Sequence, residues 1–554
     1  MAELSHEEYT KRYGPTTGDR VRLGDTGLWV RVEDDQVGFG DEPIWGYAKN
    51  FRSRMTQFDR ATSDSELDML IAGVLVIDPI LGVVKTNIGI KEGRIVGTGP
   101  AGSPDISDGI ELTIGPNTWP MNGYGLIATA GGIDSHVHLI TPRLVPVALS
   151  AGVTTLITAG FEEPPYLMDK TFRAFEGLPV NLGLQASART NVPGPAERII
   201  ELGACGLKIH EDWGAYPEVV DATLRLADAQ DVAVCLHTDG LNESCQLEDT
   251  VDAIAGRAVH AYHVEGAGGG HVPDLIGLVR EPNIVCSSTT PTIPYGRSTA
   301  AEHLDMILAV HGGSADFPDD IEAARERIHP STMAAEGPLH DLGAISIINS
   351  DSQGMGRIGE TIRRTWQLAH VMKASAGHHA DDDNERVLRY LAKYTIEPAM
   401  THGIDAEVGS LRPGRMADIV LWRPSHFGVK PELILKAGHF AWSALGLGNA
   451  SVELAEPVRY GAHWGASHGA APALATTLVS RAALEAGIRE RLGSRRRFTA
   501  VHGTRSVARA SLVRNKEVVP IEIDPDSGAV TLEGKVLAVD PVTEVPLSRR
   551  YLLA

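Results

Sequence analysis

The sequence predicts an α/β protein built on a TIM-type (β/α)8 barrel, with a second, discontinuous β-rich domain. Three observations favour this fold. Short apolar runs alternate with helical segments between residues 128 and 404, these runs number eight, and β-like patterns stand on both sides of them. Strand–helix alternation at this spacing is typical of βα units around a parallel sheet, and eight such units close a barrel.

The expected barrel strands are short and apolar, as buried parallel strands usually are. In chain order they are GLIATAGGID, VTTLITAG, VNLGLQAS, CGLKIH, VAVCLH, AVHAYH, NIVCSS and AISIINSD. Between them the apolar residues recur at helical spacing in PAERIIELGA, PEVVDATLRLADAQ and LEDTVDAIAGRA. The alternation therefore predicts helices packed around the outside of the barrel.

The regions that flank the barrel have a different texture. Strand-like runs over residues 67–127 are punctuated by Gly and Pro, and residues 405–440 turn β-like again. We expect a β-rich region over 1–127, the barrel over 128–404, a return to the same composite β domain over 405–480, and a mixed α/β segment over 481–554. In the last part, LVSRAALEAGIRERLG is predicted to form one helix.

Composition excludes several partner classes. The 554-residue chain has 50 Lys and Arg against 71 Asp and Glu, so its net charge is −21. An acidic surface repels nucleic acid and anionic lipid, and neither is expected as a partner. The N-terminus lacks the apolar core of a signal peptide, and no apolar run is long enough to span a membrane. The four cysteines form no disulfide framework, and a cytoplasmic protein is expected.

Polar residues stand at the ends of five of the apolar runs. The residues are His136, His138, Lys208, His210, His237, His263 and Asp351. The carboxyl ends of the strands form the active site of a β/α barrel, and residues two apart on a strand face the same side. A single histidine at a strand end is usually structural. Four histidines and a carboxylate in chain order instead predict a metal centre, and their N and O ligands suit Zn, Ni, Fe or Mn.

Lys208 stands out in this set. A free ammonium group only donates hydrogen bonds and cannot bind a cation. One interpretation is a substrate-binding or surface charge. The other is a carbamate formed with carbon dioxide, which would turn the amine into a carboxylate able to bridge two metals.

Several longer strings resemble the urease α subunit, the large catalytic subunit of a metal-dependent amidohydrolase. They include GLKIHEDWGA, LHTDGLNES, HVEGAGGGH, SSTTPTIPY, EHLDM, SDSQGMGRIGE and KYTIEPAMTHGI. The similarity begins near GPTTGDRVRLGDTGLWVRVEDD and continues to the RRYLLA at residues 549–554, so it covers nearly the whole chain.

The resemblance implies two nickel ions and a role for each matching residue. His237 and His263 would bind one ion, while His136, His138 and Asp351 would bind the other. Lys208, as a carbamate, would bridge them. Four further residues would serve the substrate: His210 bonding the urea oxygen, His311 as general acid on a flap over residues 311–329, Arg327 in that flap region, and Gly268 lining the substrate site.

The implied reaction is hydrolysis of urea to ammonia and carbamate, and finally to carbon dioxide or bicarbonate. The resemblance also implies urease β and γ subunits, separate or fused, in a trimer of heteromers. Accessory proteins would load the nickel.

The chain departs from the family at three points. Val310 stands where the family usually has a cysteine, and Gly312 where it commonly has a second histidine. The segment 156–170 is shorter than the family's Gly/Thr/Pro-rich loop and contains Glu162 and Glu163. It could be a trimmed surface loop or a reshaped pocket for a substituted urea or another small amide. A catalytically silent paralogue with a structural or regulatory role is the remaining alternative.

Overall fold

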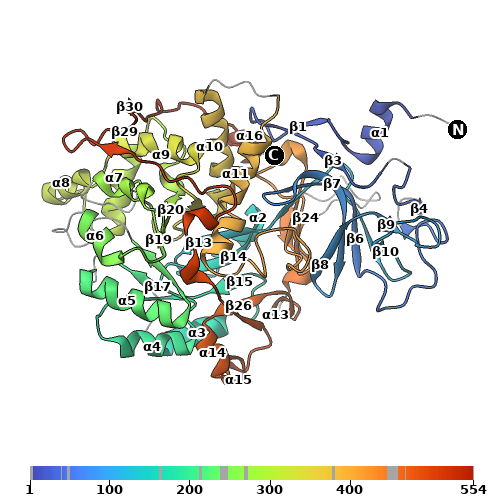
Figure 1. Cartoon of the computed structure of the whole chain (residues 1–554), viewed down its shortest axis with the longest axis horizontal. Helices are drawn as coiled ribbons and strands as arrows, with labels where there is room; N and C mark the ends of the chain where they lie inside the picture. Colours follow the sequence, from blue (N-terminus) through green and yellow to red (C-terminus); the bar gives the residue numbers. More distant parts are fainter. Residues whose placement is uncertain are drawn as a thin grey trace.

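The structure is a computed structural model that describes residues 4–552 except 39, 47–49, 161–164, 211–214, 238–246, 267–272, 377–380, 446–458 and 468. Figure 1 shows two parts side by side. Strands ringed by helices, coloured teal to yellow, form the left part, and blue and orange strands form the right part. Among the described residues, no helix is both long and apolar enough to cross a membrane.

The left part is a β/α barrel. Its strands are β13 (Gly132–Val137), β14 (Val153–Thr158), β15 (Asn181–Gly183) with β16 (Gln185–Ser187), β17 (Gly206–Ile209), β18 (Ala233–Leu236), β19 (Val259–Ala261), β20 (Ile284–Thr289) and β21 (Ile347–Asn349). Neighbours pair in parallel, and a parallel bridge from Val137 to Ser352 joins the last strand position to the first. In the described part of the chain these are the eight predicted positions, which confirms the fold class.

Helices lie around the outside of this barrel (Figure 1). They are α2 (Leu144–Ala151), α3 (Pro165–Ala174), α4 (Pro193–Leu202), α5 (Pro217–Gln230), α6 (Leu247–Ile254), α7 (Thr299–Val310), α8 (Pro318–Glu326), α9 (Pro330–Leu342), α10 (Thr361–Ala376), α11 (Asn384–Ala392) and α12 (Ile396–Thr401). The one on PEVVDATLRLADAQ starts and ends as predicted. Proline at its first position fits because that position needs no backbone N–H donor.

The right part is built around one sheet that contains strands from before and after the barrel. The earlier strands are β3 (Asp34–Asp35), β6 (Met69–Asp78), β7 (Gly82–Lys91), β8 (Arg94–Gly99), β11 (Trp119–Asn122) and β12 (Ile127–Ala130). The later ones are β22 (Ile419–Trp422), β23 (Leu433–Lys436), β24 (His439–Leu445) and β25 (Arg459–Ala462). The chain leaves this sheet at β12 and returns to it at β22, which pairs antiparallel with β12.

Two predicted elements are wrong in detail. The run GLIATAGGID is not one strand, because β12 lies in the sheet of the right part and β13 begins the barrel after Gly131. A Cβ on Gly131 would lie 2.2 Å from Thr154 Oγ1, so the close approach excludes a side chain there. The predicted helix over 478–493 is instead α14 (Arg481–Glu485) and α15 (Ile488–Leu492), separated by Gly487 with a left-handed φ of 72°.

The segment near 480 also differs from the expected division. β26 (Thr476–Val479), placed by the boundary at 480 with the β-rich domain, pairs in parallel with β15 of the barrel and with β27 (Arg497–Ala500). The C-terminal segment therefore extends the barrel side of the molecule.

Candidate metal centre

The predicted ligands meet at the carboxyl ends of the barrel strands. His136 lies on β13 and Lys208 on β17, whereas His237 directly follows β18. His263 and Asp351 come two residues after β19 and β21. Because parallel strands end at the same rim, residues far apart in the sequence line one cavity.

One half of the site brings His136, His138 and Asp351 together. The Nε2 atoms of His136 and His138 lie 3.3 and 3.1 Å from the same oxygen, Asp351 Oδ1. One ligand atom of each residue lies within 4.8 Å of the other two. Burial raises the pKa of Asp351, but the hydrogen bond from His138 and the surrounding positive charges outweigh burial and hold the pKa below its ordinary value.

The other half brings His237 and His263 together. His263 Nε2 lies 3.0 Å from His237 Nδ1, and the His210 ring stacks on His237 with centroids 3.7 Å apart. Burial, and next the charge of Lys208, lower the pKa of His136 and His237 well below the ordinary value. The imidazoles are therefore neutral, which is the form that binds metals.

Lys208 is 1% exposed, and its charge acts on His136 in one half of the site and on His237 in the other. Its Nζ lies 4.6 Å from the centroid of the Tyr262 ring. Gly160, which follows β14, makes room for this side chain. Its φ is +88°, and a Cβ there would lie 2.4 Å from Lys208 Cβ.

Two of the candidate ligands have strained backbone. His263 has a φ of 29° and Asp351 a φ of 52°, in a region that side chains rarely adopt. Such strain concentrates at functional sites, where the surrounding structure holds a side chain in a required direction.

Asp134 connects the segments that carry the candidate ligands His136, His138 and Asp351. Its Oδ1 accepts hydrogen bonds from the backbone N–H groups of His136 at 3.3 Å and Ser350 at 3.1 Å, and its Oδ2 accepts one from Thr361 Oγ1 at 3.0 Å. One buried carboxylate thereby ties β13 to the segment that carries Asp351.

A cavity of about 1090 Å³ opens over these residues. It is lined by His136, His138, Lys208, His210, His237 and Asp351, by His311 and Arg327 beside α7 and α8, and by Leu167, Lys170, Thr171 and Ala174 of α3. His263 is buried, and its Nε2 contacts Nδ1 of His237. Gly268, Glu162 and Glu163 lie outside the described residues, so the structure places none of these three predictions.

The residues present fit metal ions by their chemistry. Two imidazole nitrogens directed at one carboxylate oxygen form an N/O donor set of the kind that binds Ni or Zn.

Sequence reasoning missed three residues that shape the centre: Asp134, Gly160 and Tyr262. Asp134 and Gly160 had a signal, because each stands at the end of a predicted strand. Tyr262 had only its place next to His263, since its stacking on His136 with centroids 4.1 Å apart is a tertiary contact.

Comparisons with known proteins agree with this architecture. Residues 127–440 match the model of the amidohydrolase family, and residues 2–120 match the N-terminal domain of the urease alpha-subunit. The chain is 46% identical to urease subunit alpha 2 of Streptomyces coelicolor and to urease subunit alpha 1 of Streptomyces avermitilis, in each case over 98% of this chain and 99% of the relative.

Among solved structures, the D-hydantoinase from Thermus sp. aligns with a TM-score of 0.49 and 15% identity, covering 67% of this chain and 95% of that chain. The matches to the two family models and to the two urease α subunits show the family to which the chain belongs. The chain belongs to the amidohydrolase family, and within it to the urease α subunits.

Proposed function

We propose that this chain is the catalytic subunit of a urease and hydrolyses urea to ammonia and carbamate. The convergence of His136, His138, Lys208, His237, His263 and Asp351 at one rim of the barrel supports this function. The identity of 46% to two urease α subunits over nearly their whole length supports the same substrate.

The proposed centre holds two nickel ions. His136, His138 and Asp351 would bind one, His237 and His263 the other, and Lys208 as a carbamate would bridge them. Bound metal supplies Lewis-acid polarisation of the urea carbonyl and an activated water near neutral pH.

The remaining polar residues would position the substrate and move a proton. His210, stacked on His237 at the cavity wall, would donate a hydrogen bond to the urea oxygen. The Nδ1 of His311 lies 3.0 Å from the Ile307 carbonyl oxygen, which can only accept, so Nδ1 donates and Nε2 is left to exchange a proton. We assign His311 as the general acid for the leaving amine, because a histidine can give up a proton near neutral pH.

The flap would close over this cavity. His311 directly follows α7 and Arg327 directly follows α8, and both lie in the segment 311–329. Gly312 has a left-handed φ of 71° and allows the turn between the two helices. Closure would exclude water and bring His311 to the substrate.

Family membership implies association with other urease subunits. We propose that these are β and γ subunits in a trimer of heteromers, loaded by nickel-delivering proteins. A cytoplasmic location stays a prediction from the sequence.

One observation favours a second candidate, a substituted urea or another small amide. Residues 165–170 of the segment 156–170 form the start of α3, and four residues of this helix line a cavity much larger than urea. Lys170 among them could bind an anionic substituent.

Ammonia release tests the proposal. The chain, co-expressed with its small subunits and nickel-loading proteins, should release ammonia from urea only when nickel is supplied. Lys208→Ala should abolish this activity, and Lys170→Ala is the matched control that should retain it. Metal-loaded protein that ignores urea but hydrolyses a substituted urea would favour the second candidate. Absence of both activity and bound metal would indicate a silent paralogue.

A further inference from the structure

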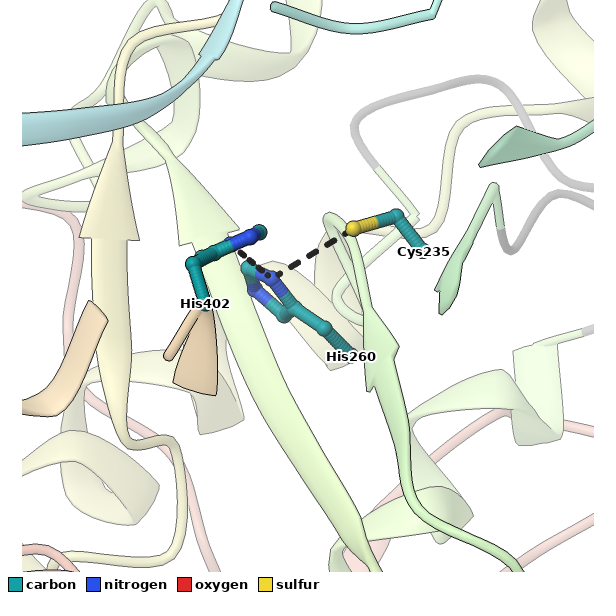
Figure 2. Close-up of side chains that lie close together, drawn as sticks. All are labelled: Cys235, His260 and His402. Carbon is teal, nitrogen blue, oxygen red and sulfur yellow. Dashed lines mark hydrogen bonds between the residues drawn. The ribbon is translucent and has the colours of Figure 1, made fainter. Parts of the chain in front are cut away.

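A second cluster of metal-ligating side chains lies inside the barrel wall, apart from the strand-end centre. It consists of Cys235 on β18, His260 on β19 and His402 directly after α12 (Figure 2). Cys235 and His260 are register partners on neighbouring strands. The three residues are 0%, 1% and 2% exposed, so solvent does not reach them.

The donor atoms are spaced as the ligands of one ion would be. Cys235 Sγ lies 3.9 Å from His260 Nδ1, and His260 Nδ1 lies 3.2 Å from His402 Nε2. One donor atom of each residue lies within 4.8 Å of the other two. Metal bonds of about 2.0–2.3 Å separate neighbouring ligand atoms by about 3.3–3.7 Å, which falls between the two observed distances.

The alternative to a metal site is a hydrogen-bonded pair of histidines beside a thiol. Both arrangements engage His260 through Nδ1, so His260 Nε2, which is buried and lacks a hydrogen-bond partner among the described residues, does not decide between them. Burial lowers the pKa of His402 to about 3 and the pKa of His260 well below its ordinary value. Both rings are therefore neutral, and neither needs a counter-charge to act as a ligand.

We infer that Cys235, His260 and His402 bind one thiophilic metal ion, Cu⁺ or Zn²⁺. Thiolate sulfur selects these soft cations, whereas the strand-end centre has only nitrogen and oxygen donors. Binding forms one metal–sulfur bond and displaces the thiol proton, which passes to water while the ion is loaded and before the site is closed off from solvent. A single thiolate neutralises Cu⁺ fully, and a three-ligand set suits it, so charge balance in this buried place favours Cu⁺ over Zn²⁺.

The ion would act as a structural tie. Cys235 is two residues before His237, and His260 is three before His263, so the site lies directly beneath one half of the catalytic centre. His402 directly follows α12, and its Nε2 lies 3.2 Å from Nδ1 of His260. Coordination would fix β18 and β19 to the end of α12 without entering the reaction.

Metal analysis of the assembled holoenzyme tests this inference. The protein is produced with nickel, copper and zinc supplied, and the metals per chain are counted by mass spectrometry. We expect one copper or zinc ion per chain, absent from Cys235→Ala and retained in Cys205→Ala, the control at another buried cysteine. The element that is found decides between Cu⁺ and Zn²⁺ as the ion bound at this site. Equal copper and zinc contents in wild type and Cys235→Ala would overturn the inference.

X-ray absorption on the wild type gives an answer even where Cys235→Ala does not fold. The copper or zinc edge should show one sulfur and two nitrogen neighbours, and a first shell without sulfur would overturn the inference. Nickel content and ammonia release report only on the proposed urease function. Both should be unchanged in Cys235→Ala, with melting temperature lowered relative to Cys205→Ala, so the two proposals can fail independently.

Discussion

Gly160 provides the space that the side chain of Lys208 occupies in the site. Its backbone has a left-handed φ, and it has no side chain that would collide with Lys208. Any L-residue there costs about 1–2 kcal/mol in backbone conformation alone. A Cβ would in addition push Lys208 out of place.

Gly160→Ala should therefore lower both the melting temperature and the nickel content, and with them the ammonia release. Gly414→Ala is the matched control, because Gly414 has a similar φ of +90° but nothing within 4 Å of the added carbon. The control should lose stability by the backbone cost alone and keep its metal. Equal metal contents in the two variants would show that Lys208 needs no such space.

Val310 gives a second prediction at this scale. It is 48% exposed and lines the cavity next to His311, whereas the cysteines at 205, 235 and 286 are buried. Iodoacetamide should not inhibit the wild-type enzyme through these three cysteines, and the treated wild type is the reference for the variant. Val310→Cys should lose most of its urea hydrolysis after the same treatment, because an alkylated thiol would block flap closure. A variant that stays active after complete alkylation would place residue 310 away from the working site.

The residues that the sequence could identify are those whose chemistry is visible locally. His136, His237 and Asp351 each end an apolar run, so their position at the rim follows from the alternation of strands and helices. Asp134 and Tyr262 act through Ser350 and His136, across the barrel. Such contacts depend on which strands meet, and a linear pattern does not contain that information.

At the scale of elements, an ion pair between Asp341 and Arg386 joins α9 to α11. Arg386 donates from Nε to Asp341 Oδ1 at 2.9 Å and from Nη2 to Oδ2 at 2.8 Å. Burial raises the pKa of Asp341, but Arg386 outweighs burial and holds the pKa below its ordinary value. A carboxyl group with a lowered folded-state pKa stabilises the fold above its unfolded pKa, and this stability is lost as the pH falls through the folded value.

Arg386→Met should thus destabilise the protein by about 1–3 kcal/mol near pH 7, because it leaves a mostly buried carboxylate without its main partner. The difference in melting temperature from wild type should shrink as the pH falls below about 4. Arg198→Met, which removes an exposed pair with Glu201, should change stability little at either pH. A difference independent of pH would indicate lost packing instead of lost charge pairing.

Element boundaries were less predictable than element types. The run GLIATAGGID has uniform strand character, and only the pairing of β12 with β22 and of β13 with β14 shows that its two parts belong to different sheets. The segment 478–493 is predicted to form one helix, yet the helix is interrupted at Gly487, whose φ is 72°. In both cases tertiary geometry at a glycine overrides a continuous local pattern.

At the scale of the whole molecule, the segment of the chain that forms the barrel is inserted between two neighbouring strands of the β-rich sheet. β12 precedes it and β22 follows it, and these two strands pair antiparallel. The β-like patterns on both sides of the barrel made this arrangement predictable. The pairing of β26 with β15 was not, because a short parallel strand near the end of the chain has no partner that its own sequence identifies.

We propose that six residues from five strand positions hold two metal ions at one rim of the barrel. Anomalous diffraction at the nickel edge from crystals of the loaded assembly tests it most directly. We predict two nickel peaks per chain, one beside His136, His138 and Asp351 and one beside His237 and His263, with density extending from Lys208 Nζ to both. A single nickel peak, or nickel peaks elsewhere in the barrel, would contradict the proposed two-metal centre.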